Sequence, residues 1–167
     1  MWASDFKQTD MKRIQLFTVI LVSLLLIALA FFFHHQLMLY SIQQFTTISF
    51  QSTTMGPAGS PLTLMLAAAL IPLLYFVANR LVGIRNRGQA FLFIGLMVGF
   101  GILGWWLRLQ YFKGLIMGYY TSPGIDNTVG VVKLQVERYC LVGVVVGAAI
   151  GMVLLMLLNR KSGGIRP

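Results

Sequence analysis

Residues 139–158 read YCLVGVVVGAAIGMVLLMLL and carry no charged side chain over their whole length. A helix rises about 1.5 Å per residue and the hydrocarbon core of a bilayer is about 30 Å thick, so a run of this length can cross a membrane. Three further stretches have the same character, at 14–33, 62–79 and 90–107. The sequence therefore predicts an all-α integral membrane protein with four transmembrane helices in a single domain, residues 1–167.

The composition leads to the same fold class. Hydrophobic residues make up 57% of the chain and charged residues 10%, whereas soluble domains carry about 25% charged residues. The mean hydropathy is +0.80. A soluble domain of this length cannot hide so much apolar surface, so lipid is the expected surrounding. The single cysteine, Cys140, allows no intrachain disulfide.

The first apolar stretch has two interpretations. Basic residues precede it, and the small residues Ala28 and Ala30 resemble a signal-peptidase site. The apolar run continues past that site to Phe33, which favours an uncleaved spanning helix.

Lysine and arginine are distributed unevenly between the segments that flank the four stretches. The two tails and the connection between the second and third stretches hold nine of the thirteen basic residues. The positive-inside rule then predicts a multi-pass protein of the cell inner membrane with both termini in the cytoplasm. We attribute the net charge of +9 to this bias and to contact with phospholipid, not to nucleic acid, because no basic face or basic–aromatic stripe is visible. The nine residues are Lys7, Lys12, Arg13, Arg80, Arg85, Arg87, Arg160, Lys161 and Arg166.

The two outer connections are the segments 34–61 and 108–138. The apolar spacing within 34–50 fits either an amphipathic helix on the membrane surface or a continuation of the first helix. In the second connection, the letters TSPG at 121–124 indicate a turn between helix-compatible segments. This pattern predicts that the third and fourth helices extend beyond the outer leaflet as a helical hairpin, with 129–138 running into the fourth helix.

Glycine recurs at every fourth residue of the fourth stretch, at Gly143, Gly147 and Gly151. Residues four apart lie on nearly one helix face, and a face without side chains lets another backbone come close in lipid. The third stretch has a shorter version at Gly95 and Gly99. Two hypotheses follow. These faces pack the helices of this chain together, or one of them, that of the fourth helix first, docks a partner chain or a second copy.

Few side chains could hold a cofactor or a lipid. His34 and His35 are adjacent, so on a helix they point about 100° apart and cannot clamp one metal ion between them. No Cys, Asp or Glu lies nearby to complete a metal site, and none is predicted. A haem held by one of these histidines, with a methionine or a partner's histidine opposite, is a further hypothesis. Arg80, Arg85 and Arg87 could contact lipid head groups, although membrane orientation explains them as well.

Acidic residues and catalytic motifs are scarce. None of the four acids lies inside a predicted stretch, which argues against a self-contained proton channel. Glu137 is the acid nearest the membrane, and Lys133 and Arg138 are expected to neutralise it. The sequence contains no GxSxG elbow, HExxH pair, carboxylate dyad or phosphate-binding glycine loop, so we do not expect an enzyme.

These features favour a non-catalytic inner-membrane subunit that packs, through glycine-rich helix faces, into a larger assembly such as a secretion, conjugation or respiratory complex. In size and topology the chain resembles small four-span proteins, including accessory subunits of bacterial secretion or conjugation machines and immunity proteins against pore-forming bacteriocins. Two alternatives stay open. One is a small transporter, channel or protein that binds lipids or small molecules, toxin-immunity proteins included. The other is a haem-binding redox subunit. The expected partners are other membrane subunits or a second copy, together with phospholipid.

Overall fold

The structure is a computed structural model that describes residues 2–43, 60–121 and 135–162. Within these ranges every regular element is an α-helix, and each helix contains a segment long and apolar enough to cross a membrane. The prediction of an all-α chain with four helices of this kind is confirmed. The helices are α1 (Trp2–Gln43), α2 (Pro61–Leu81), α3 (Arg87–Thr121) and α4 (Val136–Ser162).

The boundaries of α2 follow from one proline and one glycine. Pro61 opens the helix, where its fixed φ fits the first turn and its missing N–H is not needed. Gly83 follows the end of the helix with a φ of +72°, a conformation that costs glycine little because it has no Cβ. The N–H of Gly83 donates to the Asn79 carbonyl at 3.2 Å, which completes the last turn of α2.

Two boundaries bear on the predicted outer connections. α1 continues to Gln43, as in the second interpretation of 34–50, and residues 44–59 lie outside the described part.

The expectation that 129–138 runs into the fourth helix without a break is wrong at Gln135. The φ of Gln135 is 44°, outside the right-handed helical region, and its carbonyl accepts the Arg138 N–H at 3.2 Å as α4 begins. Residues 122–134 lie outside the described part.

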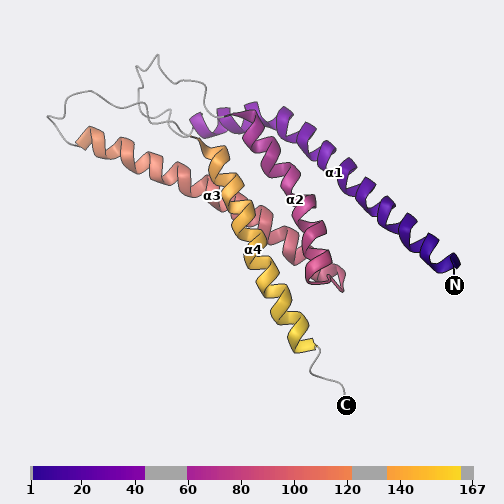
Figure 1. Cartoon of the computed structure of the whole chain (residues 1–167). Helices are drawn as coiled ribbons and strands as arrows, with labels where there is room; N and C mark the ends of the chain where they lie inside the picture. Colours follow the sequence, from indigo (N-terminus) through magenta and orange to yellow (C-terminus); the bar gives the residue numbers. More distant parts are fainter. Residues whose placement is uncertain (1, 44–59, 122–134, 163–167) are drawn as a thin grey trace.

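The helices pack in the order α1, α2, α4, α3, and α2 also touches α3. Figure 1 shows α1 lying along α2 and diverging from α4 toward its N-terminus. Among the side chains described in α1, only Ser23, Met38 and Ser41 are buried. In the described part of the chain, the four helices therefore form an open arrangement in which α2 is the main neighbour of α1.

Buried apolar side chains form two clusters, one toward each end of the helices. We call the end at which α2 passes into α3 the turn end, and the end at which α1 stops and α4 begins the opposite end. α3 and α4 contribute to both clusters. α2 adds to the cluster toward the turn end, and α1 adds to the cluster toward the opposite end. The cluster toward the turn end comprises Ala78, Phe93, Met97, Val144, Ala148 and Leu155. The cluster toward the opposite end comprises Met38, Leu109, Phe112 and Val136.

α3 and α4 approach each other most closely at the glycines of α4. A Cβ added at Gly147 would lie 2.5 Å from the Leu96 carbonyl oxygen, and one at Gly143 would overlap the Phe100 carbonyl oxygen. At Gly151 the nearest atom, 2.6 Å away, belongs to the Phe93 ring. The glycine face of α4 is therefore filled by α3 of the same chain.

The glycines of α3 lie differently. Gly95 and Gly99 are exposed, and a Cβ added at either would meet no atom within 4 Å. The docking role expected first for the fourth helix would require α3 to move away from it. The small face of α3 itself has no neighbour among the described residues.

Replacing Gly147 by alanine should destabilise the protein by about 1–3 kcal/mol, because the added methyl group meets backbone that cannot rotate aside. Gly99→Ala is the matched control, since the same change at an open site should be neutral or should stabilise the helix by up to about 1 kcal/mol. The measurement is unfolding in mixed micelles, followed by circular dichroism as the fraction of dodecyl sulfate rises. Equal stabilities for the two variants would contradict the close approach of α3 and α4.

Candidate functional site

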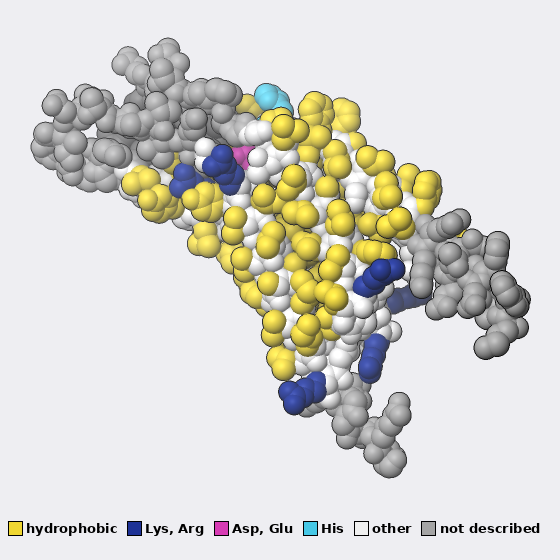
Figure 2. Space-filling view, viewed as in Figure 1, with side chains coloured by type: hydrophobic (Ala, Val, Ile, Leu, Met, Phe, Trp, Pro, Cys, Tyr) yellow, Lys and Arg dark blue, Asp and Glu magenta, His cyan; other side chains and the backbone are white. Residues whose placement is uncertain are grey.

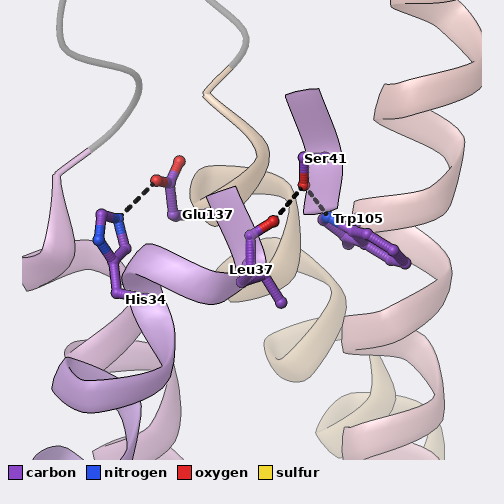
Figure 3. A network of polar contacts seen from close by, with 5 residues as sticks. All are labelled: His34, Leu37, Ser41, Trp105 and Glu137. Atoms are coloured by element: carbon purple, nitrogen blue, oxygen red, sulfur yellow. Dashed lines mark hydrogen bonds and ion pairs between the residues drawn. The ribbon is translucent and has the colours of Figure 1, made fainter. Parts of the chain in front are cut away.

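Polar side chains from three helices meet at the opposite end of the molecule. Figure 3 shows His34 of α1 directed toward Glu137 of α4, with Ser41 of α1 directed toward Trp105 of α3. The His34 Nε2 and the Glu137 Oε1 lie 3.0 Å apart. The Glu137 side chain is 1% exposed and that of His34 is 16% exposed. This is the only ion pair formed between residues that the structure describes.

Ser41 links the end of α1 to α3. The Trp105 Nε1–H donates to the Ser41 Oγ at 3.1 Å, and the Ser41 hydroxyl donates in turn to the Leu37 carbonyl at 2.7 Å. The Tyr40 ring also stacks on Trp105, with 6.0 Å between the ring centroids. Neither Ser41 nor Trp105 was assigned a role from the sequence, because a serine or tryptophan near a membrane boundary is common.

Helix geometry explains why these groups share one place. His34, Met38 and Ser41 recur at intervals of four and three residues, so they lie on one face of α1. Glu137 lies in the first turn of α4, where the positive end of the helix dipole favours a carboxylate. The contacts made by this face of α1 therefore converge on the start of α4 and on the side of α3.

The buried carboxylate needs a neutralising partner, since an isolated charge at such a place is very costly. The expected partners were Lys133 and Arg138, but Arg138 is exposed and Lys133 lies outside the described residues. His34 takes the place of these residues, with its Nε2 3.0 Å from the Glu137 Oε1. The second oxygen of Glu137, Oε2, is buried and accepts no hydrogen bond from any described group. The pair fastens α1 to α4 at the opposite end.

The same geometry limits what the histidines can bind. The Nε2 of His34 is engaged by Glu137, so a haem iron at this atom would have to displace the carboxylate. His35 is exposed. Within the described part of the chain, no three His, Cys, Asp or Glu residues lie close enough together to hold a metal ion.

A second polar group lies at the turn end, where Asn159 of α4 reaches the connection between α2 and α3. Its Nδ2 donates to the carbonyls of Val82 at 2.9 Å and Gly83 at 3.1 Å. Its Oδ1 accepts from the Gln89 Nε2 at 3.1 Å. The last turn of α4 is thereby bonded to the connection between α2 and α3.

The connection between α2 and α3 is also held by side chains of the two helices that it joins. The Arg85 N–H donates to the Gln89 Oε1 at 2.8 Å, and the Ile84 N–H donates to the Asn79 Oδ1 at 3.1 Å. We call Asn79, Gln89 and Asn159 the amide cluster. This cluster was not predicted from the sequence, where its one signal was Asn159, a polar residue directly after the apolar run 139–158.

The arginines proposed to contact lipid head groups lie close in sequence to members of the amide cluster. Arg80, Arg85 and Arg87 are exposed, and so is Arg160 of α4, which follows Asn159 in the sequence. Figure 2 shows Lys and Arg side chains at this end of the molecule, where the yellow apolar surface stops. Further Lys and Arg side chains lie toward the opposite end, near the single acidic side chain in view.

No protein family, curated protein or solved structure matches the chain. The geometry of the two polar groups and of the helix faces is therefore the basis for the function proposed below.

Replacing His34 by alanine should destabilise the protein by about 3–5 kcal/mol, because it leaves the carboxylate of Glu137 buried without a partner. Glu137→Gln should cost less, since the amide oxygen can still accept from the imidazole. His35→Ala is the control, because this neighbouring histidine is exposed. The measurement is the same unfolding titration, extended to the double variant His34→Ala/Glu137→Gln. Additive effects of the two substitutions would show that the two side chains do not interact.

Proposed function

We propose that the chain is a non-catalytic subunit of a larger assembly in a cell inner membrane. In this proposal, α3 packs against another subunit through the exposed face that contains Gly95 and Gly99. The observation that supports it is the contrast between the two glycine faces, because the face on α4 is filled by a helix and the face on α3 is open.

The contrast matters because of the lipid surroundings. Apolar surface gains little from leaving lipid for another apolar surface, so helices associate through close packing and polar bonds. Gly143 and Gly147 already bring a helix backbone into contact in this chain. Gly95 and Gly99 present the same kind of surface, with exposed Val98 and Ile102 beside it to surround an incoming helix. The open position of α1 leaves a second flank for such neighbours.

The orientation is part of the same proposal. The turn end carries Arg80, Arg85, Arg87 and Arg160, so it would face the cytoplasm, together with both termini. α3 continues to Thr121, well beyond the predicted stretch 90–107, and this extension supports a helical arm that projects past the outer leaflet. The small size of the parts outside the membrane, and the lack of catalytic motifs in the sequence, favour a structural subunit over an enzyme.

The assembly role predicts that the chain co-purifies with stoichiometric membrane partners when it is tagged at its C-terminus and extracted in mild detergent. The double variant Gly95→Leu/Gly99→Leu should insert normally and lose these partners, because the added side chains fill the open face. Ala149→Leu, an exposed small residue on α4, is the matched control and should keep them. A colourless wild-type protein that purifies as a lone monomer would contradict the proposal and favour small-molecule binding or transport.

The orientation predicts that a cysteine introduced by Arg85→Cys reacts with a membrane-impermeant maleimide only in inverted vesicles. The thiol would lie in the exposed connection at the turn end, on the cytoplasmic side. The wild-type chain, which has Cys140 alone, gives the background labelling. Labelling of Arg85→Cys in intact cells would reverse the proposed topology.

A further inference from the structure

The arginines at the turn end are attached to a backbone that the amide cluster bonds, an arrangement that membrane orientation does not require. Orientation needs positive charge on one side of the membrane and no particular geometry. Here Arg80, Arg87 and Arg160 each lie within two residues of a member of the amide cluster, and Arg85 is linked to one by a backbone hydrogen bond. Arg80 follows Asn79, the backbone of Arg85 is bonded to Gln89, Arg87 lies two residues before Gln89, and Arg160 follows Asn159.

These arginines have no acidic partner in the described part of the chain. The only described ion pair is His34–Glu137, at the opposite end. The sequence has no aspartate or glutamate between Asp10 and Asp126 and none after Glu137, so α2, its connection to α3 and the end of α4 contribute no carboxylate. The Arg80 guanidinium lies over the Phe76 ring, 5.4 Å from its centroid, a contact that leaves its positive charge unneutralised.

The backbone adds to this positive field. α3 begins at Arg87, and the first N–H groups of a helix have no acceptor within the helix and carry a partial positive charge. Gly88 lies in this first turn, with nothing within 4 Å of the place where a side chain would begin. An anion could therefore approach the start of α3 among the arginines.

The surroundings of the arginines indicate the kind of anion. Leu81 is 69% exposed and Phe91 is 76% exposed, and both lie within the candidate spans Pro61–Leu81 and Arg87–Leu115, close in sequence to the arginines. A ligand that contacts both the arginines and these exposed apolar side chains carries a phosphate and an acyl chain. We propose that the turn end binds the phosphate of an anionic phospholipid, with Arg85, Arg87 and Arg160 as its main contacts and the amide cluster as the group that positions them.

The test is native mass spectrometry of the full chain with phosphatidylglycerol and with phosphatidylethanolamine of the same acyl chains. Phosphatidylglycerol should bind more tightly to the wild-type protein. The double variant Arg85→Gln/Arg87→Gln should lose about fivefold in affinity for each arginine removed, as expected for a basic side chain at an anionic surface. Lys113→Gln/Arg138→Gln removes the same charge at the opposite end and should bind as the wild type does.

A second pair of variants separates geometry from charge. Asn159→Leu keeps every arginine but removes the bonds to Val82, Gly83 and Gln89, so it should also weaken phosphatidylglycerol binding severalfold. Gln89→Met breaks fewer of these bonds and serves if Asn159→Leu does not fold by circular dichroism. Unchanged binding in the folded variant would show that charge alone acts and would overturn the proposal.

The source of the phosphate is tested by competition. Millimolar inorganic phosphate or glycerol phosphate should not displace phosphatidylglycerol, because neither offers an acyl chain to Leu81 and Phe91. Displacement by either would identify a site for a soluble phosphate and overturn the lipid assignment. Equal binding of the two lipids by the wild-type protein would also overturn it. None of these outcomes depends on the partner proposed for α3.

Discussion

The backbone contact between α3 and α4 is the constraint on which the rest of the structure depends. The carbonyl groups of Leu96 and Phe100 occupy the space that side chains at Gly147 and Gly143 would fill, so the two helices can meet only in this register. The pair then offers one apolar cluster to α2 near the turn end and another to α1 near the opposite end. In lipid, where burying apolar surface gains little, such close packing is one of the few ways to hold helices together.

Polar bonds at the two ends attach α1 and α2 to the α3–α4 pair, which the glycines of α4 hold together. α1 touches the α3–α4 pair mainly at its C-terminal end, through His34 to Glu137 and through Ser41 to Trp105. α2 is linked to α4 by Asn159, whose side chain donates to the carbonyls of Val82 and Gly83 directly after α2. Most polar side chains at these places act on other parts of the same chain.

The sequence alone was sufficient for the four helices, because lipid demands about 20 apolar residues for each span and permits few charges within them. The sequence alone was not sufficient to predict which helices and side chains contact one another. A glycine repeat defines a helix face but not the helix that meets it, so the choice between α3 and a partner stayed open until the structure placed Leu96 against Gly147. Glu137 shows the same limit, because its partner His34 lies 103 residues away in sequence whereas the predicted partners were its neighbours. The break at Gln135 was also invisible, since a positive φ at a residue other than glycine leaves no pattern in the sequence.

At both ends of the molecule polar side chains hold the helices together, but the chemical groups differ, and the difference bears on the proposed function. At the opposite end a carboxylate and an imidazole hold the helices, and each can neutralise the other. At the turn end neutral amides do this work beside four exposed arginines. A carboxylate in the place of Asn159 could accept from Gln89, but it would repel the carbonyls of Val82 and Gly83 and would also neutralise Arg160. Amides donate and accept without altering the field, so the connection is fixed while its positive charge stays available to a group outside the chain. In the function proposed for this chain, lipid would hold the subunit at a defined depth at one end while α3 presents its open face to a neighbour.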